Sequence, residues 1–226
     1  MKNRIFLVPI ILMLLIGCNN SRKSQIEDLT ETFSRTVEMG DYLTSISVMN
    51  QIITLDSLNL DYHDTLAVLY YNTKMYTPAI VSAESVLRKK ESQKMTALLI
   101  KCYEAIGDFE SVAGHYKLKV EKNPDDLAAY YEFGLSSFYA NQFKSSLSIM
   151  NHVLKMPMAN SSTVKISTGR IVEKVPYNAA ALNVIGLSLL SLGDTTSAKR
   201  AFSEALKVYP YFELADENLK ILNQAK

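Results

Sequence analysis

A pattern that recurs about every 34 residues constrains this chain more than any other feature of its sequence. Residues 179–212 carry two apolar helical faces around a central turn, and related positions occur four times upstream. The residues expected to end the first helix of each unit are 34, 33, 34 and 52 positions apart: Gly40, Lys74, Gly107, Asn141 and Gly193. Repeats of this length predict stacked helix pairs, because each pair leaves an apolar face that only its neighbour covers.

Two further columns, each made of one equivalent position from every repeat, keep the same spacing. Small residues expected between paired helices are Ser45, Ala79, Val112, Ser146 and Ala198, and the apolar column is Ile53, Leu87, Val120, Leu154 and Leu206. The last step is longer than the others by 18 residues, so an insertion is expected at residues 161–178. Its β-branched segments on either side of Gly169 predict a short hairpin, either mobile or laid on the repeats near Tyr139 and Asn183.

The turns between paired helices carry their own signal. Glycine is followed by aspartate at residues 40–41, 107–108 and 193–194. Glycine can end a helix in the left-handed conformation, and aspartate can accept the free amides that begin the next helix. These dipeptides therefore predict tight helix-turn-helix connections.

The last unit carries a specific resemblance. Its spacing resembles the tetratricopeptide repeat (TPR), with aliphatic residues at the aromatic positions, through Leu182, Ile185, Gly186, Leu189, Ala198, Phe202 and Pro210. The resemblance implies an all-α, helix-turn-helix solenoid wound as a right-handed superhelix. The TPR domain is expected at 26–226, with repeats at 26–59, 60–92, 93–126, 127–160 and 179–212. A capping helix at 213–226 is expected to bury Leu214, Ile221 and Leu222.

The N-terminus has the features of a targeting signal. Lys2 and Arg4 precede an apolar run at residues 5–16, which is shorter than the roughly 20 residues of a membrane-spanning helix. The last residues of this run and the two that follow, Leu15-Ile16-Gly17-Cys18, resemble the lipobox of bacterial lipoproteins. That resemblance implies a signal peptide at 1–17, acylation of Cys18 with palmitate or a similar chain, and a short tether at 18–25. An uncleaved anchor or an ordinary secretory signal is the alternative.

Asn19, which follows the lipobox cysteine, bears on the destination. Asparagine in place of aspartate resembles lipoproteins that are sorted to the outer membrane. The resemblance implies a lipid-anchored protein of the bacterial cell envelope, at the outer membrane and facing the periplasm.

Composition and motif content argue against several function classes. The formal net charge is +1 and there is no long basic run, so nucleic acid is not an expected partner. His63, His115 and His152 fall in different repeats and form no ligand pattern, so we expect no metal. No nucleotide-binding or nucleophile motif is present, and we expect neither an enzyme nor a cofactor. Cys102 is expected to be a packing residue within a helix.

The residues expected to bind a partner follow from helical phase. In TPR proteins the inner, concave face comes mostly from the first helix of each repeat. That phase selects residues that run from acidic through basic to aromatic: Asp64, Tyr71, Lys101, Tyr131, Leu135, Phe138, Tyr139, Asn183 and Leu187. Tyr131, Phe138 and Tyr139 could form an aromatic anchor or could belong to the core between repeats.

The expected function is that of a membrane-anchored scaffold or adaptor for protein or peptide partners in the cell envelope. The resemblance to TPR lipoproteins includes two specialisations, the pilotins of type IV pili and the lipoproteins of outer-membrane β-barrel assembly. An alternative is a glycan-binding or small-ligand-binding accessory lipoprotein of nutrient uptake, with Tyr131 and Tyr139 stacked on a sugar. The sequence selects neither the partner nor the oligomeric state.

Overall fold

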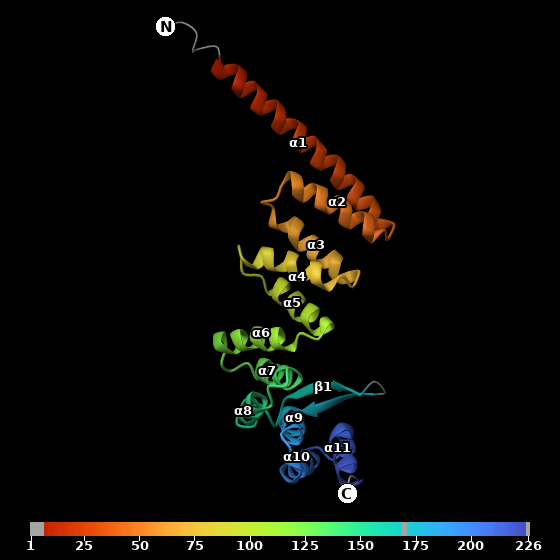
Figure 1. Ribbon diagram of the computed structural model, residues 1–226, viewed down its shortest axis with the longest axis vertical. Helices are drawn as coiled ribbons and strands as arrows, with labels where there is room; N and C mark the ends of the chain where they lie inside the picture. The colour runs from red at the N-terminus through yellow and green to blue at the C-terminus, as the bar shows by residue number, and fades with distance from the viewer. Residues whose placement is uncertain (1–6, 169–170, 225–226) are drawn as a thin grey trace. The chain divides into compact units, whose positions relative to one another are not determined.

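The computed structural model describes residues 7–168 and 171–224, with side chains from residue 21 onward. This part of the chain contains eleven α-helices and one two-stranded sheet (Figure 1). The chain divides into two compact units, Met1–Ile106 and Gly107–Lys226. The predicted all-α, TPR-type helix-turn-helix fold is confirmed in both units.

The first unit is built from consecutive packed helices. They are α1 (Leu7–Glu38), α2 (Tyr42–Leu55), α3 (Leu60–Asn72), α4 (Tyr76–Leu87) and α5 (Gln93–Ile106). One core cluster joins α2 and α3 through Ile52 and Leu66, and a second joins α4 and α5 through Val86 and Met95. Cys102 is fully buried in the second cluster, and burial raises the pKa of its thiol, as expected of a packing residue.

The second unit adds a hairpin to the helical pattern. Its elements are α6 (Phe109–Lys122), α7 (Leu127–Tyr139), α8 (Phe143–Val153), β1 (Thr163–Ser167), β2 (Val172–Pro176), α9 (Tyr177–Ser191), α10 (Thr195–Val208) and α11 (Glu213–Gln224). A single core cluster includes residues from α7, α8, β2, α9, α10 and α11. The hairpin is therefore part of the packed unit, and its presence confirms the hairpin predicted from the insertion.

The turn residues confirm the repeat register. Positive φ angles occur at all five predicted positions, Gly40 (71°), Lys74 (61°), Gly107 (77°), Asn141 (60°) and Gly193 (86°). The left-handed turn thus persists where lysine or asparagine replaces glycine. The three predicted aspartate caps also form, since Asp41, Asp108 and Asp194 each accept a backbone amide three residues later.

The column of small residues is buried at every position, from 0% exposure at Ser45 to 2% at Val112. In the fourth repeat, the Ser146 hydroxyl donates a hydrogen bond of 2.8 Å to the carbonyl oxygen of Gly134. The Ser188 hydroxyl of α9 donates in turn to Ser146 at 3.2 Å, so a buried polar contact joins two repeats.

Two local expectations differ from the structure. Ile221 was expected on the buried face of the capping helix, but its side chain is 62% exposed, and Leu219 packs in its place beside Leu222. Residues 18–25 were expected to form a tether, whereas their backbone belongs to helix α1. The side chain of Cys18 and residues 1–6 of the predicted signal lie outside the part described.

Candidate interaction surface

The inner-face residues of the first unit remain accessible. Lys101 on α5 is exposed, and Asp64 and Tyr71 on α3 are half-buried. The Tyr71 ring lies 6.0 Å from the ring of Tyr76, which begins α4. Lys94 and Ala97, which share the helical phase of Lys101, are also exposed. Helices α3 and α5 contact each other directly, so residues on both helices can contribute to one surface.

Charge on this surface is divided between two helices. Asp61 and Asp64 lie on α3, whereas Lys94 and Lys101 lie on α5. Neither Lys94 nor Lys101 forms a salt bridge within the described part of the chain, whereas Asp61 pairs with Lys90 at 3.5 Å. Such a surface can orient a segment that carries both signs of charge.

Tyr131 does not belong to an exposed face. Its side chain is only 4% exposed, and its ring meets the ring of Tyr177 edge-on at 5.4 Å. Burial raises the pKa of its phenol well above the ordinary value, with smaller contributions from Glu132, Tyr139 and Tyr177. The expectation that Tyr131 helps to anchor a partner is therefore wrong, and its ring belongs to the core.

Asn183 is also removed from the surface. It is 5% exposed, and its amide oxygen accepts a hydrogen bond of 3.0 Å from the Asn218 amide of α11. Leu135 and Leu187 are half-buried and pack against core clusters. Figure 1 shows α11 beside α9 and α10. The capping helix therefore covers part of the face on which the sequence places these residues.

The hairpin contributes to the core beside α9 (Figure 1). Val175 on β2 is fully buried, and Val164 and Ile166 on β1 pack against the same cluster. At the end of β1, the Thr168 hydroxyl donates a 3.0 Å hydrogen bond to a carboxylate oxygen of Glu213 on α11. This arrangement differs from a mobile hairpin, because side chains from both strands pack in the interior.

Phe138 and Tyr139 lie at the turn end of α7. Tyr139 is 52% exposed, and its ring centroid is 4.9 Å from Phe109 and 5.5 Å from Phe138. Phe138 also lies 5.7 Å from Phe143, so the four rings form a continuous row within the second unit. Phe109 and Phe143 were not among the candidates selected from the sequence. Each begins the second helix of its repeat, and Tyr76 begins the second helix of another repeat, so this recurring aromatic position could have identified them.

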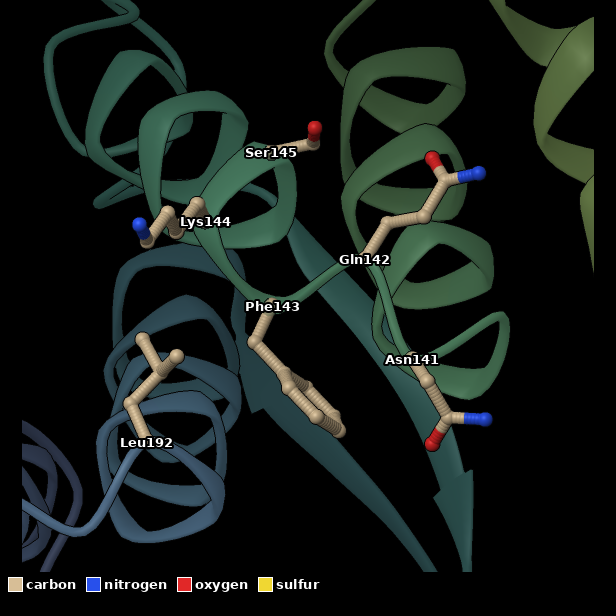
Figure 2. Close-up of a pocket in the computed structure, with 6 residues that line it drawn as sticks. All are labelled: Asn141, Gln142, Phe143, Lys144, Ser145 and Leu192. Carbon is tan, nitrogen blue, oxygen red and sulfur yellow. The ribbon is translucent and has the colours of Figure 1, made fainter.

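A shallow depression lies beside this row, at the turn between α7 and α8. It is lined by Asn141, Gln142, Phe143, Lys144, Ser145 and Leu192. Figure 2 shows that these side chains do not converge, since Gln142 and Ser145 point away from Phe143 and Leu192. The tyrosine pair proposed to stack on a sugar is not available either, because Tyr131 is buried while Tyr139 is exposed.

Among the described residues, no group of three or more histidine, cysteine, aspartate or glutamate side chains is placed to bind a metal ion. Within the same residues, no helix combines the length and the apolar character needed to cross a membrane.

Comparisons with known proteins agree with the fold. A family model for the tetratricopeptide repeat matches residues 179–212. No curated protein matches the sequence significantly. The solved structure of YrrB, titled a TPR protein with an unusual peptide-binding site, is similar with a TM-score of 0.57 and 16% identity, over 85% of this chain and 90% of YrrB.

Other similar structures have the same architecture. A TPR protein from Parabacteroides merdae ATCC 43184 gives a TM-score of 0.57 at 15% identity, over 89% of this chain and 73% of that one. MamA from Desulfovibrio magneticus RS-1 gives 0.53 at 12% identity, over 84% and 97%. Residues 179–212 are therefore a tetratricopeptide repeat by sequence, and the helix pairs give this chain the fold of TPR proteins.

Proposed function

We propose that this chain is a lipid-anchored adaptor of the bacterial cell envelope, which binds a protein or peptide partner through the inner face of its first unit. The observation that carries the proposal is the open face of α3 and α5, on which Lys94, Ala97 and Lys101 are exposed in one helical phase. In the second unit the corresponding positions, Tyr131 and Asn183, are buried. The first unit therefore offers the better surface.

The chemistry of this face suits an extended protein segment. Lysines on α5 and aspartates on α3 can orient charged side chains, and the partly exposed Val68 and Tyr71 can contact apolar ones. The fold is shared with YrrB, whose title describes a peptide-binding site, and this likeness supports a peptide as the ligand class. In place of the buried pair Tyr131 and Asn183, we propose Tyr71, Lys94 and Lys101 as the contact residues.

The proposal also includes the cellular location of the protein. The lipobox-like residues before Cys18 and the asparagine after it support an outer-membrane lipoprotein facing the periplasm. A scaffold held at that membrane is suited to the assembly of an envelope complex, as in pilotin-like or outer-membrane-assembly proteins. Fractionation of the membranes and protease treatment of intact cells test the location.

Photo-crosslinking in cells tests the binding face. A photoreactive residue at position 97 on α5 is expected to capture a discrete protein partner, because Ala97 is exposed among the proposed contacts. The matched control is position 81. Val81 is 59% exposed but lies on α4, the second helix of its repeat, whereas the proposed inner face comes from first helices. Equal capture from both positions would contradict a specific inner face.

Charge reversal of the α5 lysines should weaken this interaction. Lys94→Glu with Lys101→Glu is expected to reduce capture of the partner by about tenfold or more, with a smaller effect at high salt. The control is Lys117→Glu with Lys144→Glu, which reverses two exposed lysines of the second unit. Helical circular dichroism should be unchanged in both variants, because all four side chains are exposed.

Loss of Cys18 tests the lipid anchor. Cys18→Ala is expected to abolish incorporation of labelled palmitate and to leave an uncleaved precursor, because the thiol is the proposed acyl acceptor. Cys102→Ala is the control and should label normally, since Cys102 is buried in the first unit. Normal labelling and processing of the Cys18 variant would refute the lipoprotein assignment.

A further inference from the structure

The outer face of the hairpin places two positive charges next to each other. In the antiparallel register, Lys165 on β1 is directly opposite Lys174 on β2, and both side chains are exposed. Residues directly opposite in an antiparallel pair have Cβ atoms about 4.5 to 5.5 Å apart. Neither lysine forms a salt bridge within residues 7–168 and 171–224. The pair is therefore a local concentration of charge without a neutralising partner.

Packing on the other face keeps this pair in place. Val164 faces Val175 in the register, and both belong to the core of the second unit. The hydrogen bond from Thr168 to Glu213 ties the end of β1 to α11. Slipping the strands by one residue would bring the lysines to the inner side, so the register that buries Val175 also fixes the exposed lysine pair.

Like charges directly opposite each other destabilise a strand pair. A glutamate at one of the two positions would make the hairpin more stable, because opposite charges would then face each other. We infer that the outer face of this hairpin is a second interaction surface, which binds an acidic, extended segment of a protein partner. Carboxylates of that segment would neutralise Lys165 and Lys174, while the neighbouring Thr163 offers a hydroxyl group for hydrogen bonds.

The surface fits a protein segment better than a membrane. Recognition of anionic lipids uses clusters of about 4 to 8 basic residues, whereas this face has two lysines. Its other residues are Thr163, Ser167, Val172 and Pro176, so the face lacks the aromatic side chains that anchor proteins at a bilayer interface. An extended peptide with carboxylates on alternate residues matches a strand pair in length and charge.

Binding of a defined peptide tests this surface on the full chain in detergent. The probe is a fluorescent octapeptide of alternating glutamate and threonine, and its counterpart carries glutamine in place of glutamate. Lys165→Gln with Lys174→Gln is expected to weaken binding of the acidic peptide about tenfold or more. The matched control, Lys117→Gln with Lys155→Gln, removes two exposed lysines elsewhere in the same unit and should change the affinity less than about twofold. Unchanged affinity in the first variant, or equal binding of the glutamine peptide, would overturn the inference.

A single charge reversal separates binding from folding. Lys174→Glu replaces the like-charged pair by an attractive one, so its melting temperature should rise by about 1 to 4 °C while the acidic peptide no longer binds. If the lysines served only to guard the sheet edges against association, the double glutamine variant would self-associate but keep its affinity. That result would contradict the proposal.

Acetylation of lysines, followed by mass spectrometry, distinguishes binding to an acidic peptide from binding to an anionic membrane. The acidic peptide should protect Lys165 and Lys174, whereas reconstitution into phosphatidylglycerol vesicles, compared with phosphatidylcholine vesicles, should not. Protection by phosphatidylglycerol alone would assign the pair to a membrane and refute the protein segment. This second surface rests on the proposed adaptor function, but the two proposals can fail independently. If the hairpin did not bind the acidic peptide, loss of partner capture in the Lys94 and Lys101 variant would still support the first-unit face.

Discussion

Tyr131→Ala is expected to lower the free energy of unfolding by about 3 to 5 kcal/mol, as truncation of a large buried aromatic side chain does. Tyr131 is 4% exposed and lies in the core cluster that includes Val175 and residues of α9. Its removal would leave a cavity beside Tyr177, whose ring is 5.4 Å away. The denaturant midpoint of the second unit measures the loss.

Tyr139→Ala is the matched control for this prediction. Tyr139 lies on the same helix but is 52% exposed, so its truncation should cost only about 1 kcal/mol, mainly through the lost ring contacts. Similar losses in the two variants would mean that Tyr131 is not a core residue. Tyr131→Phe should retain most of the stability, because it preserves the ring and its packing.

Gly186→Leu is expected to destabilise the second unit by about 3 kcal/mol, the upper part of the range for overpacked cores. A Cβ atom at Gly186 would lie 2.4 Å from Cε1 of Phe202, whose side chain is fully buried. Even Gly186→Ala should therefore destabilise, although alanine favours a helix over glycine by about 1 kcal/mol. The closest atoms belong to a rigid ring, which cannot move aside without disturbing α10.

Gly134→Ala provides the comparison, because the same position of the preceding repeat faces a different partner. A Cβ atom there would lie 2.8 Å from Cε of Met150, the end of a flexible side chain. The cost of this contact and the higher helix propensity of alanine should nearly cancel, so the denaturant midpoint should change little. In the Gly186→Ala background, Phe202→Leu should cost less than in the original protein. Additive costs would show that the glycine and the ring do not conflict.

The two units differ in what their inner faces offer to a partner. In the first unit, α5 exposes Lys94, Ala97 and Lys101. In the second, packed segments of the chain itself contact the corresponding residues, with Asn218 of α11 bonded to Asn183. This contrast is the physical basis for proposing binding at the first unit and at the outer face of the hairpin.

Much of the fold could be predicted because it depends on local interactions. A positive φ at the end of the first helix and an aspartate cap at the start of the next involve residues within one turn. Their signals at Gly40 and Asp41 are therefore readable in sequence order. The β-branched arms of the insertion likewise predicted a hairpin from neighbouring residues.

The sequence by itself determined the helices, their turns and the buried small residues, because a 34-residue period records interactions that recur from one repeat to the next. It also placed the candidate residues within helices that the structure contains. Only the tertiary structure decided which of them remain accessible. Helical phase identifies a face but not what covers it. Tyr131 is buried beside Tyr177 in the core that includes the hairpin, and Asn183 bonds to Asn218 of α11, which is 35 residues away along the chain.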